Sequence, residues 1–88
     1  MKGSQDPAFK LQLKELVLRE ADKQADPAAI DDDAPLFGPR SALQLDSVDA
    51  LQISMALQLR YNWKVTDPKE ARRLLVSINV LADHLQPA

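Results

Sequence analysis

The sequence predicts an all-α fold: a small four-helix bundle of three longer helices and one short helix, with a long ordered loop between helices one and two. Its 88 residues suffice for one domain only. Apolar residues recur at helical spacing in several segments, and no segment alternates as a strand does. Apolar residues make up 45% and charged residues 27% of the chain, which is typical of a globular domain and not of a disordered one.

The first helix is expected over residues 10–23. An i, i+4, i+7, i+8 pattern places Phe9, Leu13, Leu16 and Val17 on one helical face. Residues 1–8 are polar and show no periodicity, so we interpret them as a tag remnant or a disordered N-terminus. The single domain is therefore expected to span residues 9–86.

Residues 24–45 predict a loop, because three prolines and Gly38 interrupt any helical period. This segment is long for an unstructured connection in a compact domain. Its apolar residues can pin it across the helices, so we expect an ordered, packed loop with a short helical turn. These residues are Ile30, Leu36, Phe37, Leu43 and Leu45.

The second helix is expected over residues 46–61, with Asp46 or Ser47 as its cap. It carries two apolar stripes at helical spacing. One stripe holds Ile53, Leu57 and Tyr61, and the other holds Val48, Leu51, Met55 and Leu59. One stripe must face the core. The other is either buried too, in a central helix, or exposed to a partner.

The third helix is expected over residues 68–74. It starts with Asp at the cap, Pro at the first helical position and Glu three residues after the cap, a pattern typical of helix starts. Ser77 is expected to cap the last helix, which ends before Pro87.

The charge pattern argues against a nucleic-acid partner. Residues 26–50 hold six Asp and one Arg in a chain of net charge −2, whereas phosphate binding needs clustered basic residues.

The chain has no Cys, and Asp31–Asp33 lack the further ligands of a calcium loop, so no metal site is expected. No apolar run approaches the roughly 20 residues of a membrane span. We expect a cytoplasmic monomer.

Ser47 lies beside Asp46 at the expected start of the second helix. A serine nucleophile needs a neighbouring base, and the only histidine, His84, is in the last helix. Enzyme activity and catalytic residues are therefore not expected. A phosphodiester on the Ser47 oxygen would lie at the positive end of the helix dipole. On the Asp-Ser pair alone, a simple capping serine is the favoured explanation of this position.

Residues 30–38 (IDDDAPLFG) and 43–51 (LQLDSVDAL) resemble an acyl carrier protein. The Asp-Ser-hydrophobic element at residues 46–48 is similar to the family's phosphopantetheine attachment motif, and the resemblance spans residues 9–86. It implies that Ser47 carries a covalent 4′-phosphopantetheine, placed there by a separate phosphopantetheinyl transferase. The arm would hold acyl intermediates as thioesters for fatty-acid-like or polyketide-like biosynthesis. Partner enzymes would be of the acyl-ligase, ketosynthase or acyltransferase type.

The resemblance also implies roles for both stripes of the second helix. One stripe would line an interior pocket for the acyl chain, formed by Ile53, Leu57 and Tyr61. The other would contact partner enzymes, with two carboxylates supplying charge to basic partner surfaces. This partner surface consists of Asp46, Val48, Asp49, Leu51 and Met55.

Two features depart from the family's pattern. Members usually carry several Glu along this helix, whereas here the uncharged Gln52 and Gln58 flank the second stripe. The resemblance therefore implies weaker electrostatic steering and a more apolar recognition surface. Gln44 occupies a place often held by Gly, which alters the loop geometry without blocking modification.

Two alternatives stay open. The chain resembles an aminoacyl or peptidyl carrier nearly as well, and the enzyme that loads the thiol would distinguish the two. It is also consistent with an unmodified helical interaction module that docks through Val48, Leu51 and Met55. Failure of every transferase to modify it would favour that module.

Overall fold

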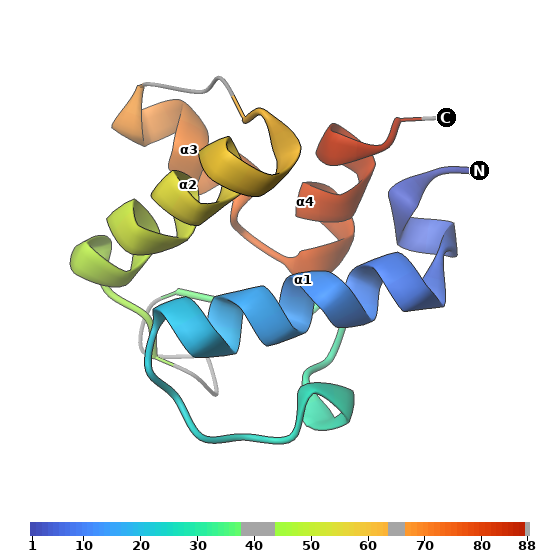
Figure 1. Ribbon diagram of the computed structural model, residues 1–88, viewed down its shortest axis with the longest axis horizontal. Helices are drawn as coiled ribbons and strands as arrows, with labels where there is room; N and C mark the ends of the chain where they lie inside the picture. The colour runs from blue at the N-terminus through green and yellow to red at the C-terminus, as the bar shows by residue number, and fades with distance from the viewer. Residues whose placement is uncertain (38–43, 64–66, 88) are drawn as a thin grey trace.

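Four α-helices and two short 3-10 helices make up the regular structure of residues 1–37, 44–63 and 67–87, which the computed structural model describes (Figure 1). The α-helices are α1 (Pro7–Glu20), α2 (Ser47–Tyr61), α3 (Pro68–Leu74) and α4 (Ile78–Leu85). The 3-10 helices are η1 (Gly3–Gln5) and η2 (Pro27–Ala29). Extended pairing among these residues is limited to one bridge between Phe37 and Leu45. The all-α prediction is confirmed.

Helix α1 begins three residues earlier than expected, because Asp6 caps it. The Asp6 side chain accepts a hydrogen bond from the Phe9 N–H at 3.2 Å, and Pro7 takes the first helical turn. The helix ends at Glu20 instead of residue 23. Shortly after it, Asp22 adopts a φ of 54°, a left-handed conformation that cannot continue a helix.

The first residues of the chain pack on α4. The Gly3 N–H donates to the Gln86 carbonyl at 2.7 Å, and the Ser4 N–H donates to Asp83 Oδ1 at 2.9 Å. A Cβ on Gly3 would collide with the Ala82 carbonyl, so only glycine permits this approach. The structure therefore places η1 against the C-terminal end of α4. An origin as a tag remnant stays a prediction.

The other three helices have the expected bounds within one residue. Asp46 caps α2, and Asn62 ends it in a left-handed conformation with φ of 57°. Asp67 accepts a hydrogen bond from the Lys69 N–H at 2.9 Å at the start of α3. Ser77 Oγ accepts one from the Val80 N–H at 3.3 Å at the start of α4.

The core lies where α1, α2 and α4 meet (Figure 1), and α3 closes it from beside α2 and α4. It is built from the inward apolar side of each helix, as the periodicity predicted. Its largest fully buried side chains are Leu13, Leu16, Val17, Leu36, Ile53, Leu57, Leu75, Ile78 and Leu81. No helix of the described residues combines the length and apolar character that crossing a membrane requires.

Two leucines of the long connection between α1 and α2, Leu36 and Leu45, reach this core. Asp32 ties the same connection to α1 through ion pairs with Lys10 at 2.8 Å and Lys14 at 2.6 Å. The expectation of one ordered loop also covers residues 38–43, including Leu43, which lie outside the described residues.

Candidate functional site

Ser47 is the first residue of α2, and its side chain is exposed. The cap around it is reciprocal. Asp46 Oδ1 accepts a hydrogen bond from the Asp49 N–H, and Asp49 Oδ2 accepts one from the Asp46 N–H, both at 3.0 Å. The two carboxylates thus fix the first turn, because each satisfies a backbone N–H that a helix start leaves without a partner. Asp46, and not Ser47, is the cap.

The electrostatics of this turn favour an ionised Asp46. The backbone N–H of Asp49 holds the pKa of the Asp46 carboxyl below its ordinary value, with smaller contributions from the Val48 N–H and from Lys23. Because Asp46 serves the backbone, the Ser47 hydroxyl is left facing solvent without a capping role. The explanation that Ser47 is only the cap of this helix, which the sequence left open, therefore does not apply.

Gln44 precedes this turn with a φ of 51°, in the left-handed region that favours glycine. Gln44 thus adopts a conformation that a glycine would adopt more easily. Leu45 follows it into the core. The approach to α2 is therefore fixed by a buried leucine next to a conformationally unusual residue.

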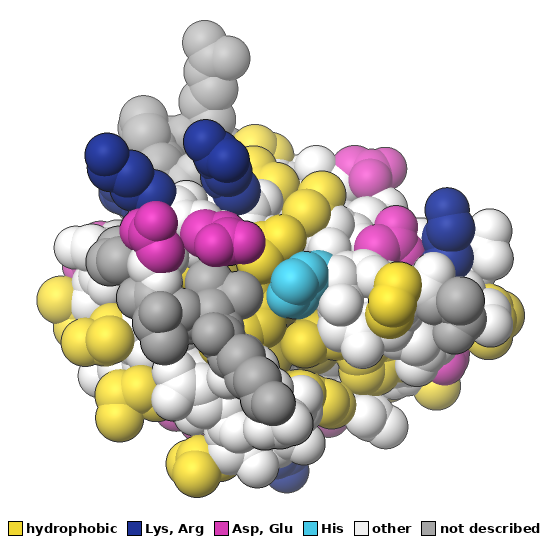
Figure 2. Space-filling model, turned by 90° about the horizontal axis from the view of Figure 1, so that it is seen from above, with side chains coloured by type: hydrophobic (Ala, Val, Ile, Leu, Met, Phe, Trp, Pro, Cys, Tyr) yellow, Lys and Arg dark blue, Asp and Glu magenta, His cyan; other side chains and the backbone are white. Residues whose placement is uncertain are grey.

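The only histidine, His84 of α4, lies beside the opposite end of α2 from Ser47. His84 packs edge-on against Trp63, with ring centroids 5.1 Å apart, and Trp63 follows the end of α2 that Ser47 begins. A helix of 15 residues is roughly 22 Å long. Figure 2 shows the His84 imidazole on the surface with apolar side chains beside it. His84 is thus placed to pack on Trp63, and not to activate the serine.

Helix α2 has one buried and one exposed apolar face. Ile53 and Leu57 are completely buried, and Tyr61 is half-buried, edge-on to Phe9 at 5.7 Å. The other stripe is exposed: Val48 by 60%, Leu51 by 62%, Met55 by 55% and Leu59 by 88%. Of the two alternatives for the second stripe, a helix buried on both sides is therefore excluded.

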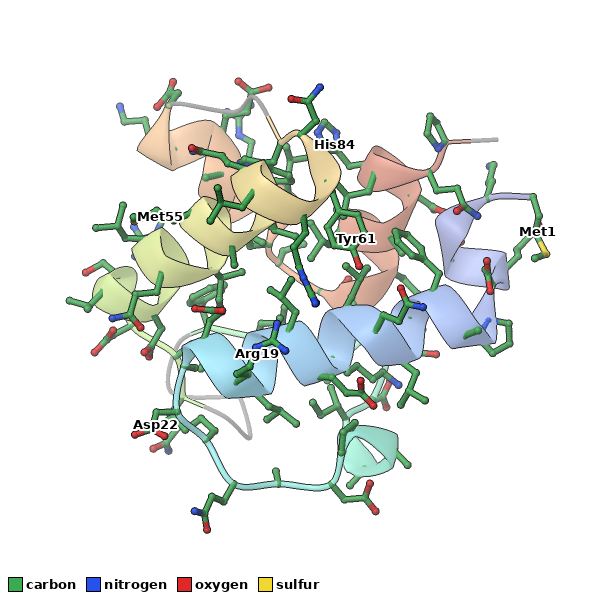
Figure 3. All side chains as sticks on the ribbon, in the orientation of Figure 1. Met1, Arg19, Asp22, Met55, Tyr61 and His84 are labelled. Atoms are coloured by element: carbon green, nitrogen blue, oxygen red, sulfur yellow. The ribbon has the colours of Figure 1, made fainter. Side chains whose placement is uncertain are left out.

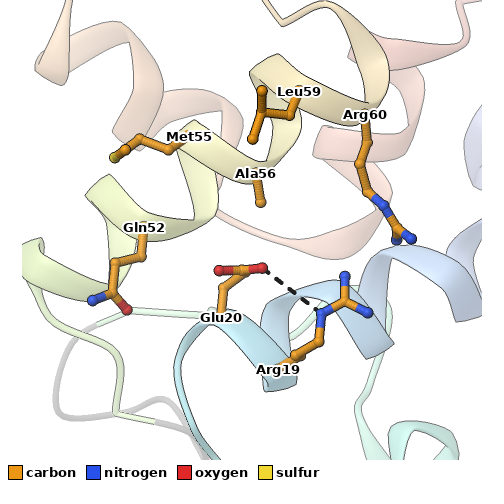
Figure 4. A pocket seen from close by; sticks show the side chains of 7 residues that line it. All are labelled: Arg19, Glu20, Gln52, Met55, Ala56, Leu59 and Arg60. Carbon is orange, nitrogen blue, oxygen red and sulfur yellow. Dashed lines mark ion pairs between the residues drawn. The ribbon is translucent and has the colours of Figure 1, made fainter.

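A groove of about 510 Å³ runs between α1 and α2 (Figure 4). It is lined by Arg19, Glu20, Gln52, Met55, Ala56, Leu59 and Arg60. A second hollow of about 500 Å³ shares Arg19 and Arg60 and adds Gln12, Glu15 and Tyr61. Tyr61 reaches from α2 toward α1 (Figure 3), where its hydroxyl donates to Gln12 Oε1 at 3.5 Å. Ile53 and Leu57 line neither hollow, so an acyl pocket at these residues stays a prediction.

No pattern in the sequence indicated a role for Arg19 or for the groove it shares with Arg60. The two arginines are 41 positions apart on different helices, so no periodicity or motif joins them. Their proximity depends on how α1 crosses α2.

The acidic run after α1 serves the fold. Asp32 pairs with Lys10 and Lys14, and Asp33 Oδ1 accepts a hydrogen bond from Asn79 Nδ2 of α4 at 2.6 Å. The described residues contain no group of three or more potential metal-ligating side chains.

No protein-family model, curated protein or solved structure matches this chain.

Proposed function

We propose that this chain is an acyl carrier protein whose prosthetic arm, 4′-phosphopantetheine, is attached to Ser47. The observation that carries the proposal is the exposed Ser47 hydroxyl at the first position of α2, freed from capping by Asp46. The Asp-Ser-Val sequence at residues 46–48 supports it through its resemblance to the attachment motif.

The position of Ser47 suits a group that another enzyme installs. The described residues around it offer no imidazole, because His84 lies at Trp63. In the proposed reaction, Ser47 Oγ attacks the β-phosphorus of coenzyme A, and the bond to the departing 3′,5′-ADP breaks. The transferase accepts the serine proton and supplies the activation that this chain lacks. The chain is therefore a substrate and partner of enzymes and not itself a catalyst.

The phosphodiester would have favourable and unfavourable neighbours. The positive end of the α2 dipole favours a negative phosphate at this position. The Asp46 and Asp49 carboxylates oppose it, but each is already engaged by a backbone N–H. Once bound, the arm supplies the thiol that carries acyl groups as thioesters, which suits a chain without Cys.

The exposed face of α2 supports a docking role beside Ser47. Val48 and Leu51 lie within the first two turns after the serine, and both are more than half exposed. With Asp46 and Asp49 they form an apolar surface with an acidic end, which complements a basic enzyme surface such as that of a transferase, a ligase or a ketosynthase. A cytoplasmic location is part of this proposal.

The test is intact-mass measurement after incubation with coenzyme A and a broad-specificity phosphopantetheinyl transferase. We expect the native chain to gain one phosphopantetheine and Ser47→Ala to gain none. Ser54→Ala is the matched control, because Ser54 is on the same helix and buried, so this variant is expected to be modified. An unmodified but folded native chain, beside a control carrier that is modified, would refute the proposal.

The exposed face specifically favours a second function. If Ser47 receives no arm, Val48, Leu51 and Met55 still form an exposed apolar surface that an interaction module would use. An aminoacyl or peptidyl load in place of an acyl load is distinguished by which ligase charges the modified chain.

A further inference from the structure

Two arginines from different helices converge on the groove between α1 and α2. Arg19 comes from the last turn of α1 and Arg60 from the last turn of α2, and their side chains point toward one another across the groove (Figure 4). Both also line the second hollow, so they stand at the boundary between the two. This arrangement places two positive charges at the centre of the α1–α2 surface.

These charges are incompletely neutralised. Arg19 pairs with Glu20 at 3.7 Å, much longer than the 2.6 Å between Lys14 and Asp32. Arg60 has no ion pair with any described residue. Two guanidinium groups that face each other repel, and a carboxylate between them would lower the energy of both through charge-assisted hydrogen bonds.

The same groove offers apolar surface. Ala56 is buried at its floor, whereas Met55 and Leu59 are exposed along the α2 side. Leu59, exposed by 88%, is the most exposed large apolar side chain among the described residues. A ligand that covers this groove must therefore combine apolar groups with negative charge.

We propose that the groove docks an acidic amphipathic helix of a partner protein. One carboxylate of this helix would lie between Arg19 and Arg60, and its apolar residues would cover Met55 and Leu59. A groove between two helices with an apolar side is a common receptor for such a helix. Arg60 lies at the opposite end of α2 from Ser47, and the groove shares only Met55 with the predicted partner surface. Docking in the groove therefore does not depend on modification of the serine.

The surrounding charge favours a protein over an anionic lipid surface. Glu15 and Glu20 flank the arginines on α1, and Asp46 and Asp49 lie at the start of α2. A broad negative membrane would meet all four carboxylates, whereas a helix can place one carboxylate locally between the arginines. The acidic start and basic end of α2 also define a direction, so a partner must be basic near Ser47 and acidic near Arg60.

Two synthetic helical peptides with the same leucine pattern test the proposal, one with glutamates and the other with lysines at the polar positions. Each peptide is titrated into the ¹⁵N-labelled Ser47→Ala variant, and binding is followed through the NMR chemical shifts of the backbone amides. We expect the glutamate peptide to bind about fivefold or more tightly than the lysine peptide, with shifts at residues 19–20 and 52–60. Because this background carries no attachment serine, the result is independent of the proposed carrier function.

Charge reversal makes the test sharper. Arg60→Glu is expected to reverse the preference between the peptides, while Arg72→Glu, the same change on exposed α3, leaves it unchanged. Leu59→Gln is expected to weaken the binding of both peptides. Leu11 is an exposed leucine of α1 outside the groove, and Leu11→Gln is expected to leave the binding of both peptides unchanged.

Several outcomes would overturn the inference. Equal affinity for the two peptides, shifts confined to α3 or α4, or an equal effect of Arg72→Glu and Arg60→Glu would each remove the specific role of the groove. Vesicles of phosphatidylglycerol and phosphatidylcholine test whether the groove binds an anionic lipid surface instead. If they shift the same residues and displace the glutamate peptide, the groove binds lipid surfaces, and the protein partner is wrong.

Discussion

Asp46 and Asp49 exchange hydrogen bonds across the first turn of α2, each accepting from the backbone N–H of the other at 3.0 Å. The arrangement has the form of a capping box in which aspartate takes the place more often held by glutamate. Its consequence is local but important. The turn that presents Ser47 is fixed by its two neighbours, so the serine side chain itself is not needed to hold it.

Replacing Asp46 by Ala is expected to lower the thermal unfolding temperature by a few degrees at neutral pH. Asp46→Asn retains most of the stability, because an amide oxygen also accepts the Asp49 N–H. The folded pKa of Asp46 lies below its ordinary value. Its stabilising contribution is therefore present above the unfolded pKa and lost as pH falls through the folded pKa.

Circular dichroism melts of the three proteins between about pH 7 and pH 2 check this prediction. The difference in unfolding temperature between the native chain and Asp46→Ala should narrow as the solution becomes acidic. A difference that stays constant over this range would mean that the ionised carboxylate does not contribute.

Replacing Asp32 by Asn is expected to reduce the free energy of unfolding by roughly 1 kcal/mol, because Asp32 joins Lys10 and Lys14. Hydrogen bonds from Lys10 and Lys14 lower the pKa of Asp32. This contribution should likewise fade as pH falls through the lowered pKa, and it should weaken in high salt. Urea unfolding measures it.

Asp31→Asn is the matched control for that experiment. Asp31 Oδ1 accepts the Asp33 N–H within its own turn, and an asparagine oxygen can do the same. We expect little change in stability. Equal losses for the two variants would show that the acidic run acts through its general charge and not through the Asp32 ion pairs.

Leu57→Ala and Leu59→Ala should differ strongly, although the residues are two positions apart. Leu57 is completely buried, and its truncation should reduce the free energy of unfolding by about 2–5 kcal/mol. Leu59 is 88% exposed, and its truncation should change stability by less than about 0.5 kcal/mol. Chemical denaturation of the two variants measures both values. Similar losses would contradict the assignment of α2 to one buried and one exposed face.

Trp63→Ala is expected to cost about 3–5 kcal/mol, because the indole is 4% exposed and packs in the core. Trp63→Phe should cost much less than this. It keeps a ring in the site and removes an indole N–H that is buried without a hydrogen-bond partner among the described residues. Urea unfolding followed by circular dichroism compares them. If Trp63→Phe costs as much as Trp63→Ala, the indole N–H makes a stabilising contribution, and the prediction is wrong.

Helices α2, α3 and α4 were predictable because their signals are local. A capping side chain acts on an N–H within about three residues, and helical periodicity is read along one segment. The start of α1 was missed although Asp6 and Pro7 carry the same signal as Asp67 and Pro68. The composition of residues 1–8 suggested a remnant, and nothing in their order reveals that Gly3 packs on Ala82.

The candidate site likewise has a part that the residue order shows and a part that only the fold shows. Ser47 and its two aspartates are neighbours in the chain, so their chemistry was visible in the residue order alone. The exposed stripe of α2 was not visible in the residue order. Two stripes of similar apolarity compete for one core, and only the packing of α2 against α1 and α3 selects between them. The meeting of Arg19 and Arg60 also required the fold, since only the crossing of α1 and α2 brings such distant positions together.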